Sequence, residues 1–188
     1  MPTVVTHGIV AVLLGKGFAT GRMSARFWAL SVLCSVLPDA DVLGFRFGIG
    51  YGDILGHRGL SHSLVFALVL SLVVAFLVLP RLPQRWSRFL VFLYFFIVTT
   101  SHGILDAMTD GGLGIAFFAP FDDTRYFFPF RAIKVSPIGL SFFSARGIDV
   151  LWSEFFWVCI PAAIIAGAVF FCRRVGRLHT PVREPNNT

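Results

Sequence analysis

Five apolar stretches divide the chain, and short polar segments separate them. They cover residues 4–15, 27–45, 60–79, 89–105 and 150–172. A helix needs about 20 apolar residues to cross the hydrocarbon core of a bilayer, with a range of about 17–25. The last three stretches meet that length, and the second meets it if its acidic end lies at an interface. We therefore predict an all-α membrane helical bundle of about five spans, with the short first stretch tilted or partly buried.

Composition supports a membrane protein and excludes two other classes. The 188 residues are 56% hydrophobic and only 14% charged, whereas soluble domains are about 45–50% apolar and about 25% charged. Disorder needs low hydrophobicity and high charge. The net charge of +6 comes from basic residues that flank the apolar stretches, so we predict no nucleic-acid partner. A single membrane domain is expected over residues 1–177, followed by a polar tail over 178–188.

Charged residues are segregated between the two sets of stretch ends. If all five stretches cross, one side receives ten basic residues: Lys16, Arg22, Arg26, Arg81, Arg85, Arg88, Arg173, Arg174, Arg177 and Arg183. Nine of the ten acidic residues fall on or near the other side. Because cytoplasmic loops carry the excess of Lys and Arg, we predict a multi-pass protein of the inner (cytoplasmic) membrane. Its C-terminus is then cytoplasmic and its acidic side extracytoplasmic.

The only long segment between predicted spans is rich in aromatic residues. Residues 113–144 hold eight Phe and Tyr126, interrupted by Pro120, Pro129 and Pro137. Aromatic side chains concentrate where a membrane meets water. We interpret residues 111–147 as an interfacial cap on the outer leaflet; a loop packed on the helix bundle explains the pattern equally well.

Ionisable residues within the apolar stretches gather at the acidic side. Such residues are costly in a membrane and are candidates for function. On the predicted topology seven lie at one depth: His7, Asp39, Asp41, His57, His62, His102 and Asp106. Histidine and carboxylate without thiolate suit Zn²⁺, Mn²⁺ or Fe²⁺. We therefore predict a divalent metal site, with Zn²⁺ favoured and one or two ions bound, because seven candidates exceed the four ligands of a closed zinc site.

Two short motifs have a local logic of their own. His102 and Asp106 are four residues apart, so they share one helix face. Asp39 and Asp41 follow Pro38, where we expect the helix to end; extended backbone would then place both on one side. Taken alone, each pattern is also compatible with ordinary hydrogen bonds or a solvated helix end.

The sequence GHRGLSHS precedes the third stretch. It contains His57 and His62, and Ser61 is a candidate cap for the helix that follows. Arg58 offers a planar fork that matches the paired oxygens of a phosphate. An alternative role for Arg58 is a salt bridge to Asp53 or Asp41.

These motifs together resemble one known family. An early Thr-His, then LPDAD, GHRGLSHS, SHGILDAMTDGG and a later FPF are similar in order to the bacterial inner-membrane metal-dependent hydrolases of the YdjM-like family, over about residues 6–139. The resemblance implies hydrolase activity. It also implies that the seven residues of the predicted cluster are the functional positions.

A more distant likeness is to zinc-dependent phospholipase C. His7, Asp39, His62 and the His102–Asp106 pair follow the order of that family's ligands, but no HxxxE follows them. Glu154 has a valine four residues earlier, so a full three-metal site is not expected. Glu154 is open to three interpretations, namely a lone ligand, a group that orients a ligand, or a buried acid paired with an arginine; we favour the last.

We therefore predict a membrane-bound metal-dependent hydrolase, in particular a phosphoesterase acting on a lipid or lipid-linked substrate through a metal-activated water. His7, Asp39, His62, His102 and Asp106 are the expected metal ligands. Asp41, His57 and Arg58 are the expected catalytic residues, and Asp41 and His57 are alternatively ligands of a second ion. Arg58, Arg125 and Arg131 are expected to bind the substrate. The alternatives are a non-catalytic protein with a structural metal site and an ion or solute transporter.

Overall fold

A computed structural model describes residues 1–18, 23–79, 87–137 and 139–178, and within these ranges the chain is helix and loop without a β-strand. The helices in chain order are α1 (Val4–Phe18), α2 (Ala25–Val36), η1 (Leu37–Phe47), η2 (Leu60–His62), α3 (Leu64–Val73), η3 (Val74–Val78), α4 (Arg88–Ala107), η4 (Gly139–Phe142), α5 (Ala145–Glu154), η5 (Phe155–Cys159) and α6 (Ile160–Leu178). The prediction of an all-α fold is confirmed for the described residues. The polar tail expected after Arg177 lies, from residue 179 on, outside them.

Three helical segments are long and apolar enough to cross a membrane. They are Ala25–Phe47, Arg88–Ala107 and Ala145–Arg174, and two shorter apolar helices cover Val4–Phe18 and Leu64–Val78. Each shorter helix has 15 residues, which at about 1.5 Å per residue spans about 22 Å, less than the roughly 30 Å of a hydrocarbon core. The number of crossings therefore stays a prediction.

Serine residues begin three of these helices. The hydroxyls of Ser24, Ser63 and Ser87 accept hydrogen bonds from the amide of the third residue of α2, α3 and α4 respectively, as N-caps do. Ser63 rather than Ser61 is thus the cap of α3, which corrects the expectation from the sequence. Ser61 has another role, described below.

The second span does not end at Pro38. It tightens there into the 3₁₀ helix η1, which continues through Phe47 and ends at Gly48 in a left-handed conformation. The expectation of extended backbone after Pro38 is therefore wrong. Proline is tolerated because it stands near the start of η1, where its missing N–H has no helical partner to satisfy.

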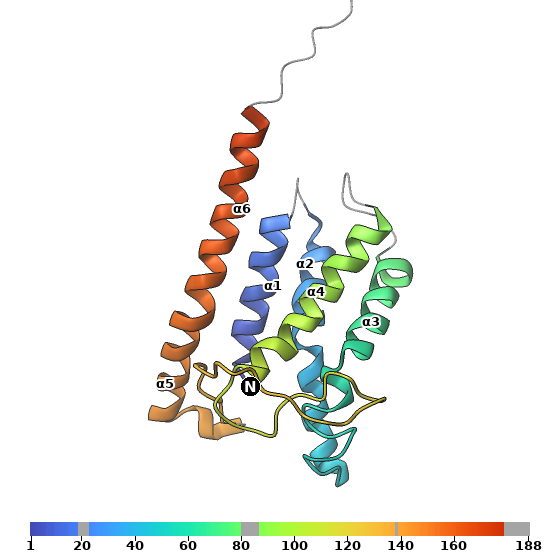
Figure 1. Cartoon of the computed structure of the whole chain (residues 1–188), viewed down its shortest axis with the longest axis vertical. Helices are drawn as coiled ribbons and strands as arrows, with labels where there is room; N and C mark the ends of the chain where they lie inside the picture. The colour runs from blue at the N-terminus through green and yellow to red at the C-terminus, as the bar shows by residue number, and fades with distance from the viewer. Residues whose placement is uncertain (19–22, 80–86, 138, 179–188) are drawn as a thin grey trace, which may run out of the picture.

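The apolar core lies among α1, α2, α3 and α4. Phe27, Phe95 and Val98 are fully buried there. Tyr94 ties three of the helices together, because its hydroxyl donates to the carbonyl of Ala11 at 3.1 Å and contacts the hydroxyl of Ser31 at 3.0 Å. The continuous α5–η5–α6 segment stands at the side of this bundle (Figure 1), and only 6% of its most apolar window is buried.

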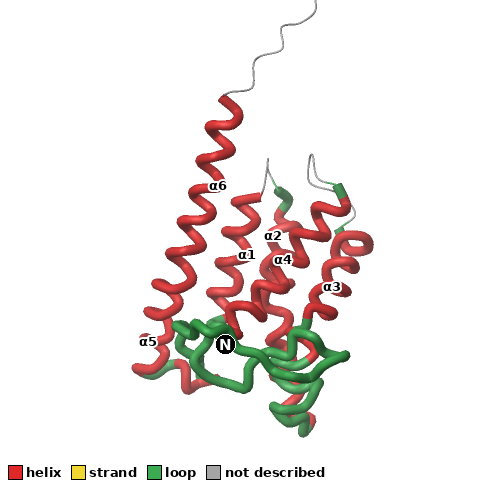
Figure 2. Tube along the Cα trace, viewed as in Figure 1, coloured by secondary structure: helices red, strands yellow, loops and turns green. Residues whose placement is uncertain are grey.

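The two ends of the bundle differ in structure. Loops gather at one end, where α1 begins and α4 finishes (Figure 2). Among the described basic residues, Lys16, Arg26 and Arg88 lie at the opposite end, close to the last turn of α1 and the first turns of α2 and α4. The ends of α1, α2 and α4 that carry these three residues therefore lie opposite the end with the loops, which holds the candidate site.

Candidate metal centre

The seven residues of the predicted cluster come from separate elements at the loop end. They are His7 on α1, Asp39 and Asp41 on η1, His57 in the turn before η2, His62 on η2, and His102 and Asp106 on α4. Except for Asp41, which is partly buried, each is at most 5% exposed. The structure thus brings together residues that are up to 99 positions apart in the chain.

Four of these residues form a compact group that we call the quartet: Asp39, His62, His102 and Asp106. One ligand atom from each lies within 4.8 Å of the others. Nε2 of His102 is 3.1 Å from Nε2 of His62 and 3.4 Å from Oδ1 of Asp39. Nε2 of His62 is 3.7 Å from the same Oδ1 and 3.6 Å from Oδ2 of Asp106.

The spacing of these atoms fits a metal ion. Zinc binds histidine nitrogen and carboxylate oxygen at about 2.0–2.2 Å in a tetrahedron, whose donor atoms are then roughly 3.3–3.6 Å apart. The carboxylate oxygens of Asp39 and Asp106 are buried and have no hydrogen-bond partner among the described residues. Buried polar atoms are nearly always satisfied, and a divalent cation held by these atoms would fit their spacing and supply the missing partners.

Hydrogen bonds on the far side of each ring orient the two histidines of the quartet. Nδ1 of His102 is 2.7 Å from the carbonyl oxygen of Ser35, which can only accept, so Nδ1 carries the proton. Nδ1 of His62 lies 2.9 Å from Oγ of Ser61 and 3.2 Å from Oδ2 of Asp41. Both rings therefore turn an Nε2 lone pair toward the quartet, as metal-binding histidines do.

Asp41 connects the quartet to His57. Its Oδ1 is 2.7 Å from Nδ1 of His57, and its Oδ2 accepts hydrogen bonds from the amide of Arg58 at 3.1 Å and from Oγ of Ser61 at 2.5 Å. Asp41, His57 and His62 also meet the spacing for a second ion. Because the Asp41 oxygens already have these partners, the geometry favours an orienting role for this carboxylate.

Arg58 is fully buried and pairs with Oδ2 of Asp106, the same oxygen that lies near Nε2 of His62. Its Nε is 3.1 Å from Oδ2 of Asp106, and its two Nη atoms donate to the carbonyl of Gly111 and to Oγ1 of Thr109 at 2.8 and 3.0 Å. Its salt-bridge partner is thus Asp106, not Asp53 or the Asp41 carboxylate. Because all three nitrogens of its guanidinium already have protein partners, the geometry favours a positioning role for Arg58 over contact with a substrate.

The other two arginines expected to bind substrate lie in the loops. Arg125 donates to the carbonyls of Tyr51, Asp53 and His57 at 3.1–3.2 Å and so fastens the loop that carries His57. Arg131 is exposed, with its guanidinium 4.6 Å from the centre of the Phe127 ring. Their roles toward a substrate stay predictions.

Tyr51 lies beside this group of loops. Burial raises the pKa of its phenol, so the hydroxyl stays protonated at neutral pH. Its ring packs edge-on against His57, with 5.2 Å between the ring centres.

His7 stands next to the quartet without belonging to it. Its ring stacks on His102 with 3.8 Å between centres, and its Nε2 is 3.5 Å from Oδ1 of Asp106. Neither ring nitrogen has a hydrogen-bond partner among the described residues. His7 is therefore placed as a fifth candidate ligand.

Comparison with known proteins identifies the family of the chain. The family described as YdjM inner membrane protein matches residues 1–176. The chain belongs to the YdjM family. A relative named inner membrane protein YbcI, from Escherichia coli (strain K12), is 38% identical over 178 residues, which cover 93% of this chain and 100% of that protein. No solved structure matches the chain. The resemblance seen in the motifs is thus confirmed, and this YdjM-family chain is an inner membrane protein with transmembrane helices.

Several supporting residues of this YdjM-family site had no signal in the sequence. The carbonyl of Ser35 and the hydroxyl of Thr109 belong to residue types that occur everywhere in membrane helices and loops. Ser61 stands inside a motif, yet its contact with Asp41 depends on how η1 and η2 meet. Only the tertiary structure assigns these roles.

Proposed function

We propose that this protein is a membrane-embedded, metal-dependent hydrolase, in particular a phosphoesterase. The observation that carries the proposal is the quartet, in which two Nε2 atoms converge in a buried site with two carboxylates that accept no hydrogen bond from the described residues. Two histidines and two carboxylates suit Zn²⁺, with Mn²⁺ and Fe²⁺ as alternatives. A divalent cation bound there supplies Lewis acidity and lowers the pKa of water.

The protein side chains divide into roles around that chemistry. Asp39, His62, His102 and Asp106, with His7 beside them, are the proposed ligands. Asp41 holds Nδ1 of His57, which leaves Nε2 of His57 to exchange a proton as a general base or acid. Arg58 orients Asp106 through its buried ion pair.

The depth of the site supports a lipid or lipid-linked substrate. From Arg88 to His102 the helix α4 rises about 21 Å, so the quartet lies roughly 9 Å inside the far face of a 30 Å hydrocarbon core if Arg88 marks the near face. Large aromatic side chains are exposed on the surrounding loops, such as Phe121 at 87% and Phe143 at 85%. Aromatic residues favour the membrane interface, where lipid phosphates lie. We place this face on the extracytoplasmic side, from the basic residues at the opposite ends.

A structural metal site is the second candidate. Four protein ligands complete a tetrahedron, whereas catalytic zinc usually keeps one position open, and the quartet is almost fully buried. In this interpretation the ion joins η1, η2 and α4, and no substrate reaches it.

The test is metal analysis of detergent-purified protein, followed by assays of the same samples. We expect stoichiometric metal in the wild type and its loss in Asp39→Ala and His102→Ala. Asp149→Ala is the matched control, because Asp149 is exposed at the same end of the molecule and its ion-pair partner among the described residues is Lys134. A wild type without metal after gentle purification would contradict both candidates.

Chelator-sensitive hydrolysis of phospholipids or phosphodiesters by the metal-loaded protein supports the enzyme. Bound metal without hydrolysis of either substrate class, together with a fall in thermal stability on chelation, favours the structural site.

A further inference from the structure

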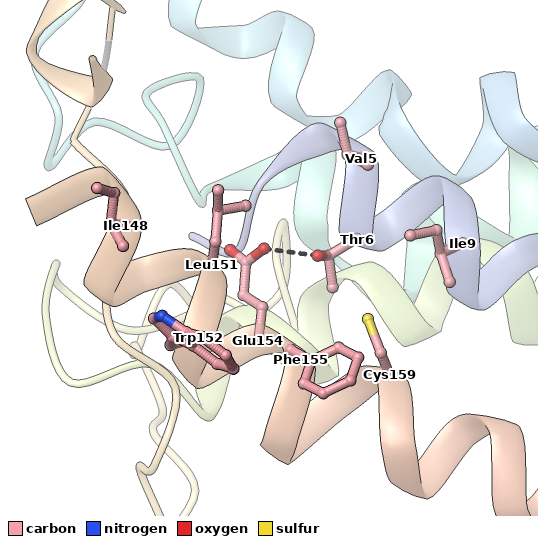
Figure 3. A pocket seen from close by; sticks show the side chains of 9 residues that line it. All are labelled: Val5, Thr6, Ile9, Ile148, Leu151, Trp152, Glu154, Phe155 and Cys159. Carbon is pink, nitrogen blue, oxygen red and sulfur yellow. Dashed lines mark hydrogen bonds between the residues drawn. The ribbon is translucent and has the colours of Figure 1, made fainter. Parts of the chain in front are cut away.

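Glu154 is a buried carboxylate that the proposed chemistry does not use. It ends α5 and is 1% exposed. Its oxygens accept hydrogen bonds from the amide of Thr3 at 2.5 Å, from Oγ1 of Thr3 at 2.6 Å and from Oγ1 of Thr6 at 2.5 Å; Figure 3 shows the bond to Thr6. Its partners are therefore two threonines at the start of α1, and the expected pairing with an arginine is wrong.

These bonds hold the first turn of α1. Oγ1 of Thr3 also accepts a hydrogen bond from the amide of Thr6 at 3.3 Å. The carbonyl oxygen of Thr3 accepts one from the amide of His7 at 3.2 Å. Thr3 thus caps the helix, and Glu154 fixes the cap from a neighbouring helix. A carboxylate at a helix N-terminus also interacts favourably with the helix dipole.

The surroundings of Glu154 strengthen these contacts. Apolar side chains of α1, α5 and η5 line the hollow that contains it, among them Val5, Ile9, Leu151 and Phe155 (Figure 3). Hydrogen bonds are stronger in such a low-dielectric environment, and leaving one partner unpaired costs more. The link between α5 and the start of α1 is therefore well defined.

His7 depends on this link more than the other histidines of the site do. His62 and His102 are each oriented by a hydrogen bond to Nδ1. The ring of His7 has no such hydrogen bond to a described residue; it stacks on His102, and its Nε2 is 3.5 Å from Oδ1 of Asp106. Its position is set mainly by the backbone of the turn that Thr3 and Glu154 hold.

We infer that Glu154 is a positioning residue that presents His7 to the metal centre by holding the first turn of α1. The inference rests on the proposed metal site and adds a distant carboxylate to it. It requires that the effect of Glu154 on metal affinity pass through His7.

A double-mutant cycle tests this requirement. Zn²⁺ affinity is measured by competition with a chromogenic chelator for the wild type, Glu154→Gln, His7→Ala and the double variant. Replacing groups that support a ligand typically weakens metal binding about 10–100-fold, so we expect such a loss in each single variant. In the double variant we expect no further loss beyond that of His7→Ala, because the two residues act as one unit.

Ser153→Ala is the matched control for Glu154→Gln. Ser153 precedes Glu154, and its hydroxyl accepts a hydrogen bond from the amide of Lys134 in the loop region. Removing this hydroxyl should therefore leave the Zn²⁺ affinity unchanged. A loss from Glu154→Gln that is equally large in the His7→Ala background would overturn the inference, as would an unchanged affinity. In both cases the wild type still binds metal, so the proposed function survives; a wild type that binds no metal removes both.

Thr6 supplies a second, milder pair of variants if Glu154→Gln does not fold. Thr6→Val keeps the side-chain shape and removes the donor to Glu154, whereas Thr6→Ser keeps the donor. We expect Thr6→Val to bind Zn²⁺ about tenfold more weakly and Thr6→Ser to bind as the wild type does. A purely structural role predicts lower melting temperatures with equal affinities, and that result contradicts the inference.

Discussion

The direction in which the two histidines of the quartet face is set by the ring nitrogen that points away from it. In His102 that nitrogen donates to the carbonyl of Ser35, and in His62 it contacts Ser61 and Asp41. These bonds select one tautomer and one ring orientation before any ion arrives. At the scale of single residues, the site therefore depends as much on the groups behind the histidines as on the histidines themselves.

Asp41→Asn tests this division between ligand and supporting group. We expect Zn²⁺ affinity to fall about 10–100-fold while the number of bound ions stays the same, because the amide weakens the contact to Nδ1 of His62 without removing a ligand. Asp39→Asn should instead lose the ion. Metal content and affinity are measured on the purified proteins. If Asp41→Asn lowers the content from two ions to one, Asp41 is a ligand of a second ion and the orienting role is wrong.

At the scale of elements, the site is built where helices start, stop or change winding. His7 is in the first turn of α1, Asp39 in the first turn of η1, and His102 and Asp106 in the last turns of α4. The loop after α4 then returns over Arg58, whose Nη1 donates to the carbonyl of Gly111 at 2.8 Å, and Gly112 follows directly. A Cβ at Gly112 would overlap the guanidinium of Arg58 and crowd the hydroxyl of Tyr51.

Two glycine substitutions separate the effect of this contact from that of backbone strain. Gly112 and Gly48 have φ values of 88° and 79°, but only Gly112 has side chains against the position of its missing Cβ. The left-handed conformation costs other residues about 1–2 kcal/mol, so both Gly48→Ala and Gly112→Ala should destabilise the protein. Crowding adds roughly 1–3 kcal/mol for Gly112→Ala alone.

Thermal unfolding in detergent and Zn²⁺ affinity report the two effects of these glycine variants. We expect the larger fall in melting temperature for Gly112→Ala, together with weaker metal binding, because Arg58 supports Asp106. Equal falls in both variants, with equal affinities, would show that the approach of the loop to Arg58 is unimportant.

At the scale of the whole molecule, helix direction and charge agree. The basic residues Lys16, Arg26 and Arg88, in the last turn of α1 and the first turns of α2 and α4, lie opposite the site. Basic residues remain preferentially in the cytoplasm. We therefore predict that the candidate metal centre lies in the extracytoplasmic half of the bilayer.

Reporter fusions test this orientation. A fluorescent protein fused at the C-terminus should be active, because it folds in the cytoplasm, and a phosphatase reporter inserted after Asp123 should be active outside it. Asp123 is exposed in the loop region, so the insertion should leave the bundle intact. In the control, the phosphatase is fused at the C-terminus and the fluorescent protein is inserted after Asp123. Neither the phosphatase activity nor the fluorescence should then be detected. A cytoplasmic reading from the Asp123 insertion would contradict the topology and the side assigned to the site.

Much of the site could be predicted because membrane helices contain so few polar residues. Where nearly every position is apolar, His102 and Asp106 stand out, and their spacing alone places them on one helix face. Helix positions were predictable for the same reason. The η1 helix was not, because nothing in the residues after Pro38 distinguishes a 3₁₀ helix from extended chain until η2 packs against it.

The partners of buried charges were harder to predict than the charges themselves. Glu154 was expected to pair with an arginine, and Arg58 with Asp53 or Asp41. The structure instead gives Glu154 two threonines and gives Arg58 the carboxylate of Asp106. For each buried charge the sequence offers several polar groups that could be its partner. The packing of α1 against α5 selects the threonines for Glu154, and the packing of the loop after α4 selects the partners of Arg58.

The amino-acid sequence alone thus indicated the class of protein, the long apolar helices and the residues that gather at one end, because burial in a bilayer makes hydrophobicity and rare charges highly informative. The tertiary structure alone decided which four residues share one centre, which nitrogen each histidine presents, and which groups hold them. Those choices depend on distances of 3–4 Å between side chains on different elements. Such distances arise from how helices pack, and no spacing along the chain encodes them.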